Sequence, residues 1–222
     1  SMRSVPMTGF KPELNYNTIN SGHADYYWGM GNTAEAVANQ FNISREDQDE
    51  FAYKSHVKAL KALSENRFQD QIAPIKVEET YLDSNGKKVN RNYEVTKDEG
   101  PRKGTSISAL SKLRAVFANN GSVTAGNSSQ MSDGAAFVMV MSEDMVKELN
   151  IEPIARMVNY AAAGVEPKIM GIGPVAAVPK VLKQSGLKQN DIELIELNEA
   201  FASQSLAVMR ELNLNQDIVN VN

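Results

Sequence analysis

Cysteine is absent from the 222-residue chain, and histidine occurs only at His23 and His56. The lack of cysteine excludes a disulfide framework, thiolate metal sites and a cysteine nucleophile within these residues. Two imidazoles are too few for a multi-histidine zinc site, so the sequence predicts no metal site.

A basic excess is also lacking. The formal net charge is −4 and the isoelectric point is about 5.3. A general nucleic-acid binder would normally carry a basic excess, so no nucleic-acid partner is expected. Hydrophobic residues make up 42% and charged residues 23%, as is typical of globular proteins.

Long hydrophobic runs are missing as well. No stretch approaches the roughly 18 apolar residues of a membrane span, so no membrane partner is expected. The start, 1–7, lacks the apolar core of a signal peptide, and the chain is expected to be cytoplasmic. Because residue 1 is not Met and 217–222 resembles a strand in mid-course, both ends are expected to be cuts through a longer protein.

Local patterns predict helices, a hairpin and long loops in the first part of the chain. Apolar spacing and capping residues predict helices over 33–41, 44–66, 106–117 and 143–149. Alternation predicts strands over 72–77 and 88–95, and Asn85-Gly86 between them predicts a hairpin turn.

The later part has a more regular pattern. Strands are expected over 134–141, 154–163, 192–197 and 218–221, and helices over 175–185 and 198–211. The apolar run 134–141 suits a strand buried on both faces. The β-α-β-α-β order from residue 154 onward predicts a layered α/β domain.

Polar segments supply the candidate site residues. Asn198 follows a predicted buried strand, where ligands bind in open α/β sheets, although it also suits a simple helix cap. A neutral amide can donate a hydrogen bond to developing negative charge without ionising. The polar turn 124–134 suits a ligand channel or an ordinary connection.

Cations and aromatic residues provide further candidates. Arg102, Lys103, Lys112 and Arg114 suit a phosphate-rich ligand or a solvated basic face. The glycine-rich turn 170–174 has neither P-loop nor dinucleotide-binding spacing. Both histidines are expected to be structural or surface residues.

Several motifs in order resemble those of the thiolase family, of the 3-ketoacyl-CoA thiolase or acetyl-CoA acetyltransferase type. They cover the whole chain. These motifs are Ser-Met-x-x-Val-Pro-Met at 1–7, Met-Gly-x-Thr-Ala-Glu at 30–35, Ser-Arg-Glu-Asp-Gln-Asp at 44–49, Thr-Ala-Gly-Asn-Ser-Ser at 124–129, Ser-Asp-Gly-Ala-Ala at 132–136, Met-Gly-Ile-Gly-Pro at 170–174 and Asn-Glu-Ala-Phe-Ala at 198–202.

The resemblance implies an α/β fold with a layered αβαβα core, present here in part, and an inserted loop domain of helices, hairpin and loops. Residues 1–131 would form this CoA-binding loop domain. Residues 132–150 would end the N-terminal half, and residues 151–222 would begin the C-terminal half.

The resemblance also implies roles for individual residues. Asn198 would hold the water of an oxyanion hole, Ser129 would contact the pantetheine arm of CoA, and Arg102 would meet its adenosine end. Leu113 and Phe117 would lie near that end. Met30, Met170 and Phe201 would surround the acyl and pantetheine channel. CoA and acyl-CoA would be substrates, with no cofactor, and the intact protein would form a homo-oligomer.

The implied reaction needs residues that these 222 lack. Thiolases use a cysteine nucleophile, a Gly-His-Pro histidine and a second cysteine as acid/base, so this chain alone is expected to be inactive.

Gly29 replaces a histidine found in short-chain relatives, which favours broader 3-ketoacyl substrates. A non-catalytic CoA-binding module is the alternative; a ketoacyl synthase is disfavoured by the Asn-Glu-Ala-Phe motif.

Overall fold

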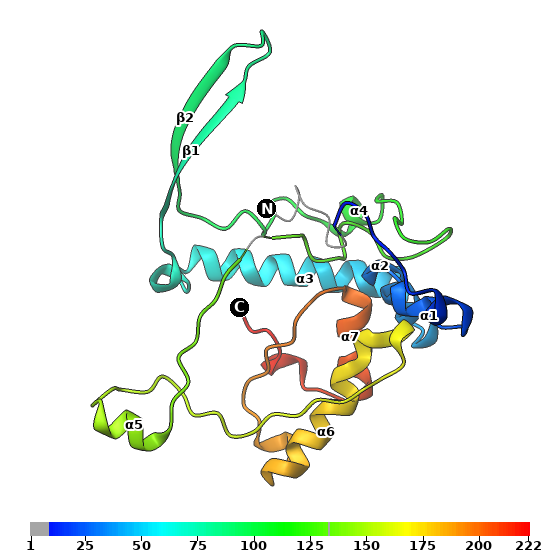
Figure 1. Ribbon diagram of the computed structural model, residues 1–222, viewed down its shortest axis with the longest axis vertical. Helices are drawn as coiled ribbons and strands as arrows, with labels where there is room; N and C mark the ends of the chain where they lie inside the picture. The colour runs from blue at the N-terminus through cyan, green and yellow to red at the C-terminus, as the bar shows by residue number, and fades with distance from the viewer. Residues whose placement is uncertain (1–8, 133) are drawn as a thin grey trace.

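The computed structural model describes residues 9–132 and 134–222 (Figure 1). The motif at 1–7 and residue 133 of the 132–136 motif lie outside the described residues. The α-helices are α1 (Tyr16–Asn20), α2 (Met30–Gln40), α3 (Arg45–Ser64), α4 (Ile107–Leu110), α5 (Glu143–Glu148), α6 (Gly173–Ser185) and α7 (Ala202–Glu211). The strands are β1 (Ile75–Leu82) and β2 (Lys88–Val95).

Short 3-10 helices connect several of these elements. They are η1 (Ala24–Tyr27), η2 (Gln69–Gln71), η3 (Pro167–Ile172), η4 (Gln189–Asp191) and η5 (Gln216–Ile218). Across 9–132 and 134–222, no helix combines the length and the apolar character that crossing a membrane requires.

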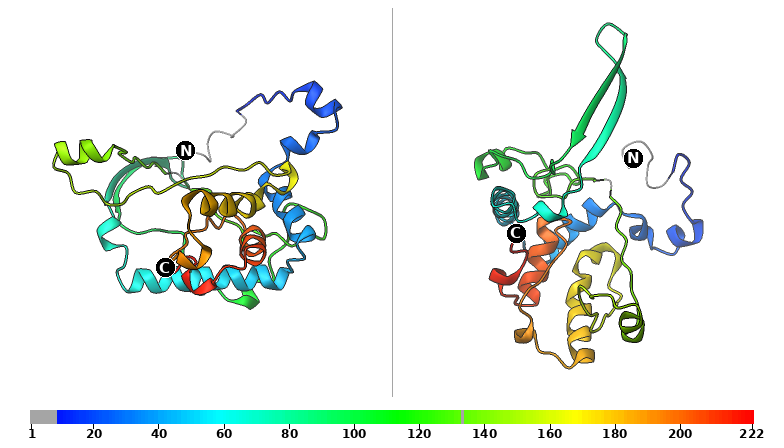
Figure 2. Two further views of the ribbon diagram at one scale, coloured as in Figure 1. Left: turned by 90° about the horizontal axis from the view of Figure 1, so that it is seen from below. Right: turned by 90° about the vertical axis from the view of Figure 1, so that its left-hand side faces the viewer.

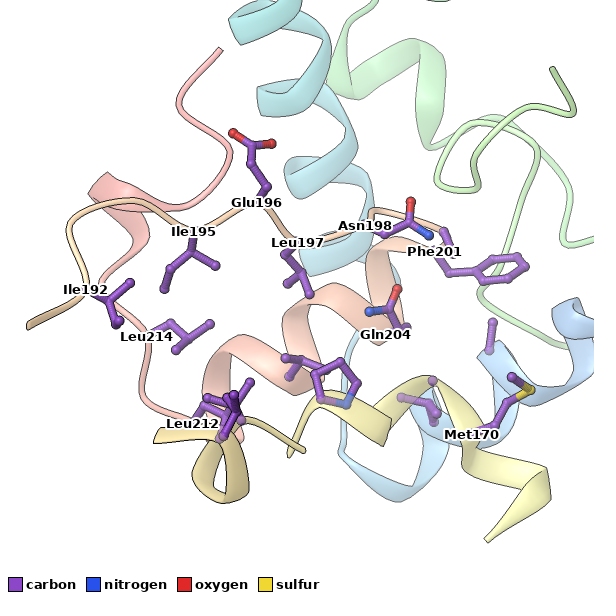
Figure 3. A pocket seen from close by; sticks show the side chains of 18 of the residues that line it. Met170, Ile192, Ile195, Glu196, Leu197, Asn198, Phe201, Gln204, Leu212 and Leu214 are labelled. Carbon is purple, nitrogen blue, oxygen red and sulfur yellow. The ribbon is translucent and has the colours of Figure 1, made fainter. Parts of the chain in front are cut away.

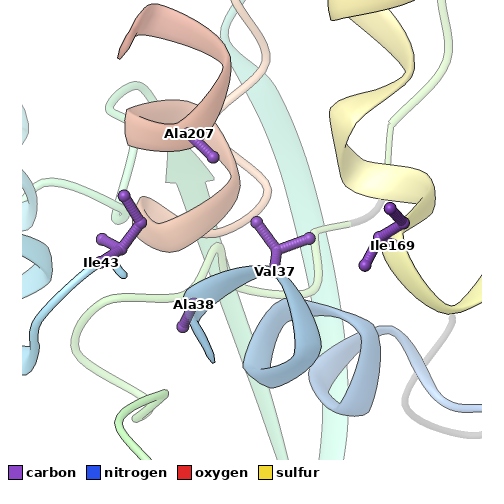
Figure 4. Close-up of a cluster of buried hydrophobic side chains, with 5 residues drawn as sticks. All are labelled: Val37, Ala38, Ile43, Ile169 and Ala207. Atoms are coloured by element: carbon purple, nitrogen blue, oxygen red, sulfur yellow. The ribbon is translucent and has the colours of Figure 1, made fainter. Parts of the chain in front are cut away.

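The core lies where α2, α7 and η3 pack together. Val37 and Ala38 of α2 meet Ala207 of α7 and Ile169 of η3, and Ile43 closes the cluster (Figure 4). Burying an aliphatic side chain contributes about 1.5–3 kcal/mol relative to leaving it exposed. This cluster therefore fixes α7 against α2, although the two helices are far apart in sequence.

Helix α3 confirms the prediction for 44–66. The Ser44 hydroxyl accepts a hydrogen bond from the Asp47 amide at 3.0 Å and so satisfies one of the free donors at the helix start. Glu46 and Asp47 lie in the first turn, where their negative charges interact favourably with the positive end of the helix dipole. The predicted helices over 33–41, 143–149 and 175–185 are likewise confirmed as α2, α5 and α6.

The predicted hairpin is present and projects away from the helices (Figures 1 and 2). Strands β1 and β2 pair antiparallel from Ile75–Val95 to Leu82–Lys88. Asp83 closes the turn because its carboxylate accepts the amides of Asn85 and Lys87, each at 2.9 Å. The predicted start of the first strand, residue 72, is three residues before the start of β1. Residues 69–71 form η2, and Pro74 directly precedes the paired segment.

The predicted layered sheet is not formed among the described residues, where β1–β2 is the one sheet. The segments 134–141 and 154–163 were wrongly predicted as strands: neither contains helix or strand, and residue 154 lies in a bend. Phe137 is 98% exposed and Ile154 fully so. A buried parallel strand depends on neighbours on both sides, and local apolar pattern cannot provide them.

The predicted strands 192–197 and 218–221 are each reduced to one bridge position. Ile195 and Val219 form a parallel bridge, in which the Ile195 amide donates to the Ile218 carbonyl at 2.8 Å. Both segments were therefore predicted as longer strands than the structure contains. Residues 216–218 form η5 instead of strand.

Two predicted helices are shorter in the structure. Helix α4 ends at Leu110 rather than 117. The Leu110 carbonyl accepts the Leu113 amide at 3.0 Å in a tighter turn, and Arg45 donates to the carbonyls of Leu110 and Leu113. Helix α7 begins at Ala202, and its N-cap is Phe201. Asn198 therefore lies in the preceding loop and was wrongly predicted as the cap.

A buried carboxylate on α2 fixes the chain that follows α4. Glu35 is 5% exposed. Its Oε1 accepts the Val123 amide at 2.9 Å, and both of its oxygens accept the Ser122 amide at 3.0 Å. Gly121 passes so close that an added Cβ would overlap Oε1.

Replacing this carboxylate should destabilise the fold. We expect Glu35→Ala to lower the free energy of unfolding by about 3 kcal/mol, because it leaves two amide donors without their acceptor. Glu13→Ala, at an exposed position of the N-terminal segment, is the control. Urea denaturation followed by circular dichroism measures both; equal effects would contradict this role.

Candidate functional site

Two cavities lie on either side of the segment that leads into α7. The first, the apolar cavity, has a volume of about 600 Å³. Its walls come from α2, α6, α7 and residues 192–197. In the view of Figure 3, Ile192 and Leu214 lie at one end of it, and Asn198, Phe201 and Met170 lie toward the other.

The second cavity, the Arg102 cavity, has a volume of about 750 Å³. One wall is the face of α3 that carries Ala52, Ser55 and His56, and another is the loop 100–105. Leu113 and residues 125–130, Ser129 among them, also line this cavity. Hydroxyls and cations give this cavity a polar character that the apolar cavity lacks.

Asn198 lines both cavities. It is exposed, so its amide is free to meet a ligand from either side. A side chain at such a junction can contact both an apolar group in one cavity and a polar group in the other.

Backbone pairing holds the Asn198 segment against the polar turn. The Ser129 amide donates to the Ala200 carbonyl at 2.9 Å, and the Ala202 amide donates to the Asn127 carbonyl at 3.0 Å. These bonds form an antiparallel bridge between Ser128 and Phe201. Residues from two distant parts of the sequence thereby share one site.

Side chains hold the other side of the same segment. Glu199 accepts the Ser55 hydroxyl at 2.6 Å and the Asn220 amide group at 2.8 Å. Asn220 also bonds both backbone groups of Leu197, accepting its N–H at 2.7 Å and donating to its carbonyl at 2.8 Å. The loop that presents Asn198 is thus attached to α3 and to the chain near residue 220.

The predicted site residues fall into three placements. Met30, Met170 and Phe201 line the apolar cavity, and Arg102, Leu113 and Ser129 line the Arg102 cavity. Phe117 lines neither, but its ring meets that of Phe201 edge-on, with centroids 6.2 Å apart. Gly31 lets Phe117 approach α2, because an added Cβ would overlap the ring.

Lys112 and Arg114 do not share this placement. Neither is among the residues that line the Arg102 cavity, whereas Arg102 and Lys103 are. The predicted group of four cations is therefore divided, and the loop 100–105 provides the positive charge of the site.

Sequence reasoning missed His56, Glu199 and Asn220. His56 was predicted to be structural or superficial, yet it lines the Arg102 cavity. Its spacing of four from Ala52 and three from Ala59 on α3 places it on the cavity face, a signal present in the sequence. Asn220 and Glu199 act through long-range hydrogen bonds, which local patterns do not reveal.

The environment of His56 disfavours its charged form. Burial lowers the pKa of His56, and the positive charge of Arg102 lowers it further, while Glu199 acts in the opposite direction. The imidazole Nδ1 accepts the Arg102 backbone amide at 3.3 Å. Neutral His56 therefore helps to hold the start of the Arg102 loop.

No metal centre accompanies these groups in the part of the chain that the structure describes: it contains no cluster of three or more histidine, aspartate or glutamate side chains suited to a metal ion. What the arrangement offers is a neutral amide, hydroxyls and cations around two cavities that share Asn198 in their linings.

This combination of fold and site places the chain in a known class. Residues 13–144 match the family described as thiolase, N-terminal domain, and residues 151–222 match thiolase, C-terminal domain. The chain therefore belongs to the thiolase family.

Individual relatives agree with this assignment. The chain is 46% identical to the 3-ketoacyl-CoA thiolase of Bacillus subtilis strain 168, over 100% of this chain and 56% of that protein. The chain spans about half the length of the curated relatives it matches.

Solved structures give the same result. The dimeric peroxisomal thiolase of Saccharomyces cerevisiae superposes with a TM-score of 0.82 at 38% identity, over 99% of this chain and 52% of that one. Human mitochondrial 3-ketoacyl-CoA thiolase in complex with CoA gives 0.77 at 42% identity, over 87% and 46%. The structure is thus a partial thiolase-like fold.

The pKa of His56 leads to a test of stability against pH. Because folding lowers this pKa, the unfolded chain binds more protons than the folded chain near the usual histidine pKa of about 6.5. The contribution of neutral His56 to the free energy of unfolding is therefore present above that pH and is lost as pH falls toward the folded pKa. We expect His56→Gln to reduce the loss of unfolding free energy between about pH 7.5 and 5.5.

His23→Gln is the matched control, since His23 is exposed and its ring stacks on that of Tyr26. Denaturant titrations at both pH values measure the slopes. Identical pH slopes for the wild type and His56→Gln would contradict the proposed origin of the effect.

Proposed function

We propose that this chain forms the CoA-facing part of a thiolase active site. The reaction is thiolysis of a 3-ketoacyl-CoA, or the reverse condensation of two acyl-CoA molecules. The observation that carries the proposal is the position of Asn198, at the junction of an apolar cavity and a polar, cationic one. Family membership and the likeness to a thiolase solved with CoA support it.

The reaction divides into two acyl transfers. A cysteine thiolate attacks the ketone carbon of the 3-ketoacyl-CoA; the bond between the α and β carbons breaks, and the departing carbanion takes a proton to become acetyl-CoA. The thiol of a second CoA then attacks the acyl-cysteine and receives the shortened acyl group. Each attack develops negative charge on a carbonyl oxygen, which a hydrogen-bond donor stabilises.

Asn198 is proposed to hold the water that donates to this oxygen. Its amide remains neutral throughout, so it can orient a donor without exchanging protons with the intermediate. Glu199 and Asn220 on one side, and the 127–129 backbone on the other, restrict the loop that carries it. Such restriction lowers the cost of reorganising the donor when charge develops.

The Arg102 cavity suits CoA. Ser129 is proposed to contact the pantetheine arm, while Arg102 meets the phosphate-bearing adenosine end and Leu113 packs beside it. Phe117 is proposed to lie near the same end, next to Phe201. Charge-assisted hydrogen bonds from arginine to phosphate are among the stronger polar contacts in proteins.

The apolar cavity suits an acyl chain. Met30, Met170 and Phe201 are proposed to contact the acyl group and the adjoining pantetheine. Gly29, which leaves space where short-chain relatives carry a histidine, favours 3-ketoacyl substrates longer than acetoacetyl.

The division of the chain into domains also belongs to this proposal. We propose that residues 1–131 form the CoA-binding loop domain, that 132–150 complete the N-terminal half, and that 151–222 begin the C-terminal half. In the intact protein a homo-oligomer is proposed, as for the dimeric yeast relative.

The 222 residues contain no cysteine, so the chain alone is expected to give no thiolysis. The test adds acetoacetyl-CoA or a longer 3-ketoacyl-CoA, with CoA, to the purified chain and follows loss of the substrate at the wavelength where its enolate absorbs. An intact thiolase is the positive control. Turnover comparable to that enzyme would contradict a cysteine-dependent mechanism.

CoA binding should nevertheless be measurable by calorimetry. We expect Arg102→Ala to weaken CoA binding about tenfold, because a charge-assisted hydrogen bond contributes about 1.5–3 kcal/mol. Arg91→Ala is the matched control, since Arg91 stacks on Tyr93 in the hairpin. Equal effects of the two changes would contradict a CoA site in the Arg102 cavity.

The absence of cysteine also favours a second candidate, a non-catalytic CoA-binding module. Both candidates bind CoA, so genomic DNA on both sides of the coding segment distinguishes them. A reading frame that continues into Gly-Gly and Gly-His-Pro supports the thiolase, and a stop codon at that point supports the binding module.

A further inference from the structure

Asn127 uses every polar group of its side chain inside the protein. It is 3% exposed. Its Oδ1 accepts the Thr124 amide at 2.7 Å, and its Nδ2 donates to Asp49 Oδ1 at 3.0 Å and to the Ser122 carbonyl at 3.1 Å. An amide is the side chain that offers both an acceptor and two donors at this position.

Asp49 extends this contact to the segment that contributes Leu110 and Leu113 to the lining of the Arg102 cavity. The carboxylate is 2% exposed, and its second oxygen accepts Arg45 Nε at 2.8 Å. Arg45 Nη2 donates to the carbonyls of Leu110 and Leu113, at 2.8 and 2.9 Å. A continuous path of hydrogen bonds therefore joins the polar turn, α3 and the Leu113 wall.

The backbone of Asn127 continues the path toward Asn198. Its carbonyl accepts the amide of Ala202, which is the first residue of α7. Two residues after Asn127, the Ser129 amide donates to the Ala200 carbonyl. The same residue thus contacts α3 through its side chain and the Asn198 segment through its backbone.

We propose that Asn127, with Asp49 and Arg45, is a positioning residue that sets the spacing between the Leu113 wall, Ser129 and the Asn198 segment. Asn127 does not itself react. It acts by holding these groups in one arrangement before the ligand arrives. The inference rests on the proposed function, because it assigns the Arg102 cavity to CoA.

A reciprocal exchange of the two side chains tests this proposal. N127D places two carboxylates against each other, whereas D49N/N127D restores a donor and an acceptor between positions 49 and 127 in reversed order. In both variants the Ser122 carbonyl loses its donor. In D49N the side-chain amide oxygen can still accept a hydrogen bond from Arg45. The double-mutant cycle isolates the coupling between these two positions.

Two measurements on the 222-residue chain provide the readouts: CoA affinity by calorimetry, and hydrogen exchange of the Ser129 and Ala202 amides by NMR without CoA. We expect N127D to weaken CoA binding and to accelerate both exchange rates, each about tenfold. D49N/N127D should recover part of both losses, because the bond between positions 49 and 127 returns while the Ser122 carbonyl still lacks its donor.

A control separates positioning from general stability. Ile43 belongs to the core cluster but is not among the residues that line either cavity, so Ile43→Ala should lower the melting temperature with CoA affinity unchanged. Positioning is overturned if Ile43→Ala weakens CoA binding as much as N127D does, or if the double variant is no better than N127D. If N127D does not fold, D49N replaces it as the single variant. D49N must then weaken CoA binding and accelerate amide exchange, each by less than the tenfold expected for N127D, and the double variant must reverse part of these changes.

The two proposals fail in different ways. If the wild-type chain shows no saturable CoA binding, the proposed function fails, and the exchange rates alone then decide the positioning role. If the wild type binds CoA but the exchange rates of Ser129 and Ala202 do not respond to N127D, the positioning role fails and the proposed function stands.

Discussion

The arrangement of the site depends on one short pairing of backbone, between residues 127–129 and 200–202. Two hydrogen bonds, of 2.9 and 3.0 Å, join a polar turn that follows α4 to the loop that begins α7. This pairing holds Asn198 and Ser129 at the same cavity. The buried groups around it, Glu35 and Asp49 in particular, hold the polar turn in the position that the pairing requires.

Local features of the sequence predicted those elements that local interactions stabilise. Ser44 caps α3 with its own hydroxyl, and the Asp83 carboxylate closes the Asn-Gly turn of β1–β2, so nearby residues are sufficient for both. The segments 134–141 and 154–163 differ because a strand in a parallel sheet requires neighbours from distant parts of the chain. In the described residues they have none, and their apolar side chains remain exposed.

The same distinction applies to the candidate site. Polar residue types and motif order indicated Asn198, Ser129 and Arg102, and the structure brings these to two cavities that meet at Asn198. Their roles stay predictions. The contacts that hold these residues, such as Glu199 with Asn220, join positions whose relation appears only in three dimensions. Spacing along α3 contained the signal for His56, but its meaning depended on knowing which face bordered a cavity.

The central claim is that CoA binds along the Arg102 cavity and reaches Asn198. The most direct measurement is titration of the isotope-labelled chain with CoA, followed through its backbone amide resonances. The account predicts saturable shifts at Arg102, Ser129 and Asn198, with little change at β1 and β2. Shifts absent from the cavity, or concentrated on the hairpin, would contradict it.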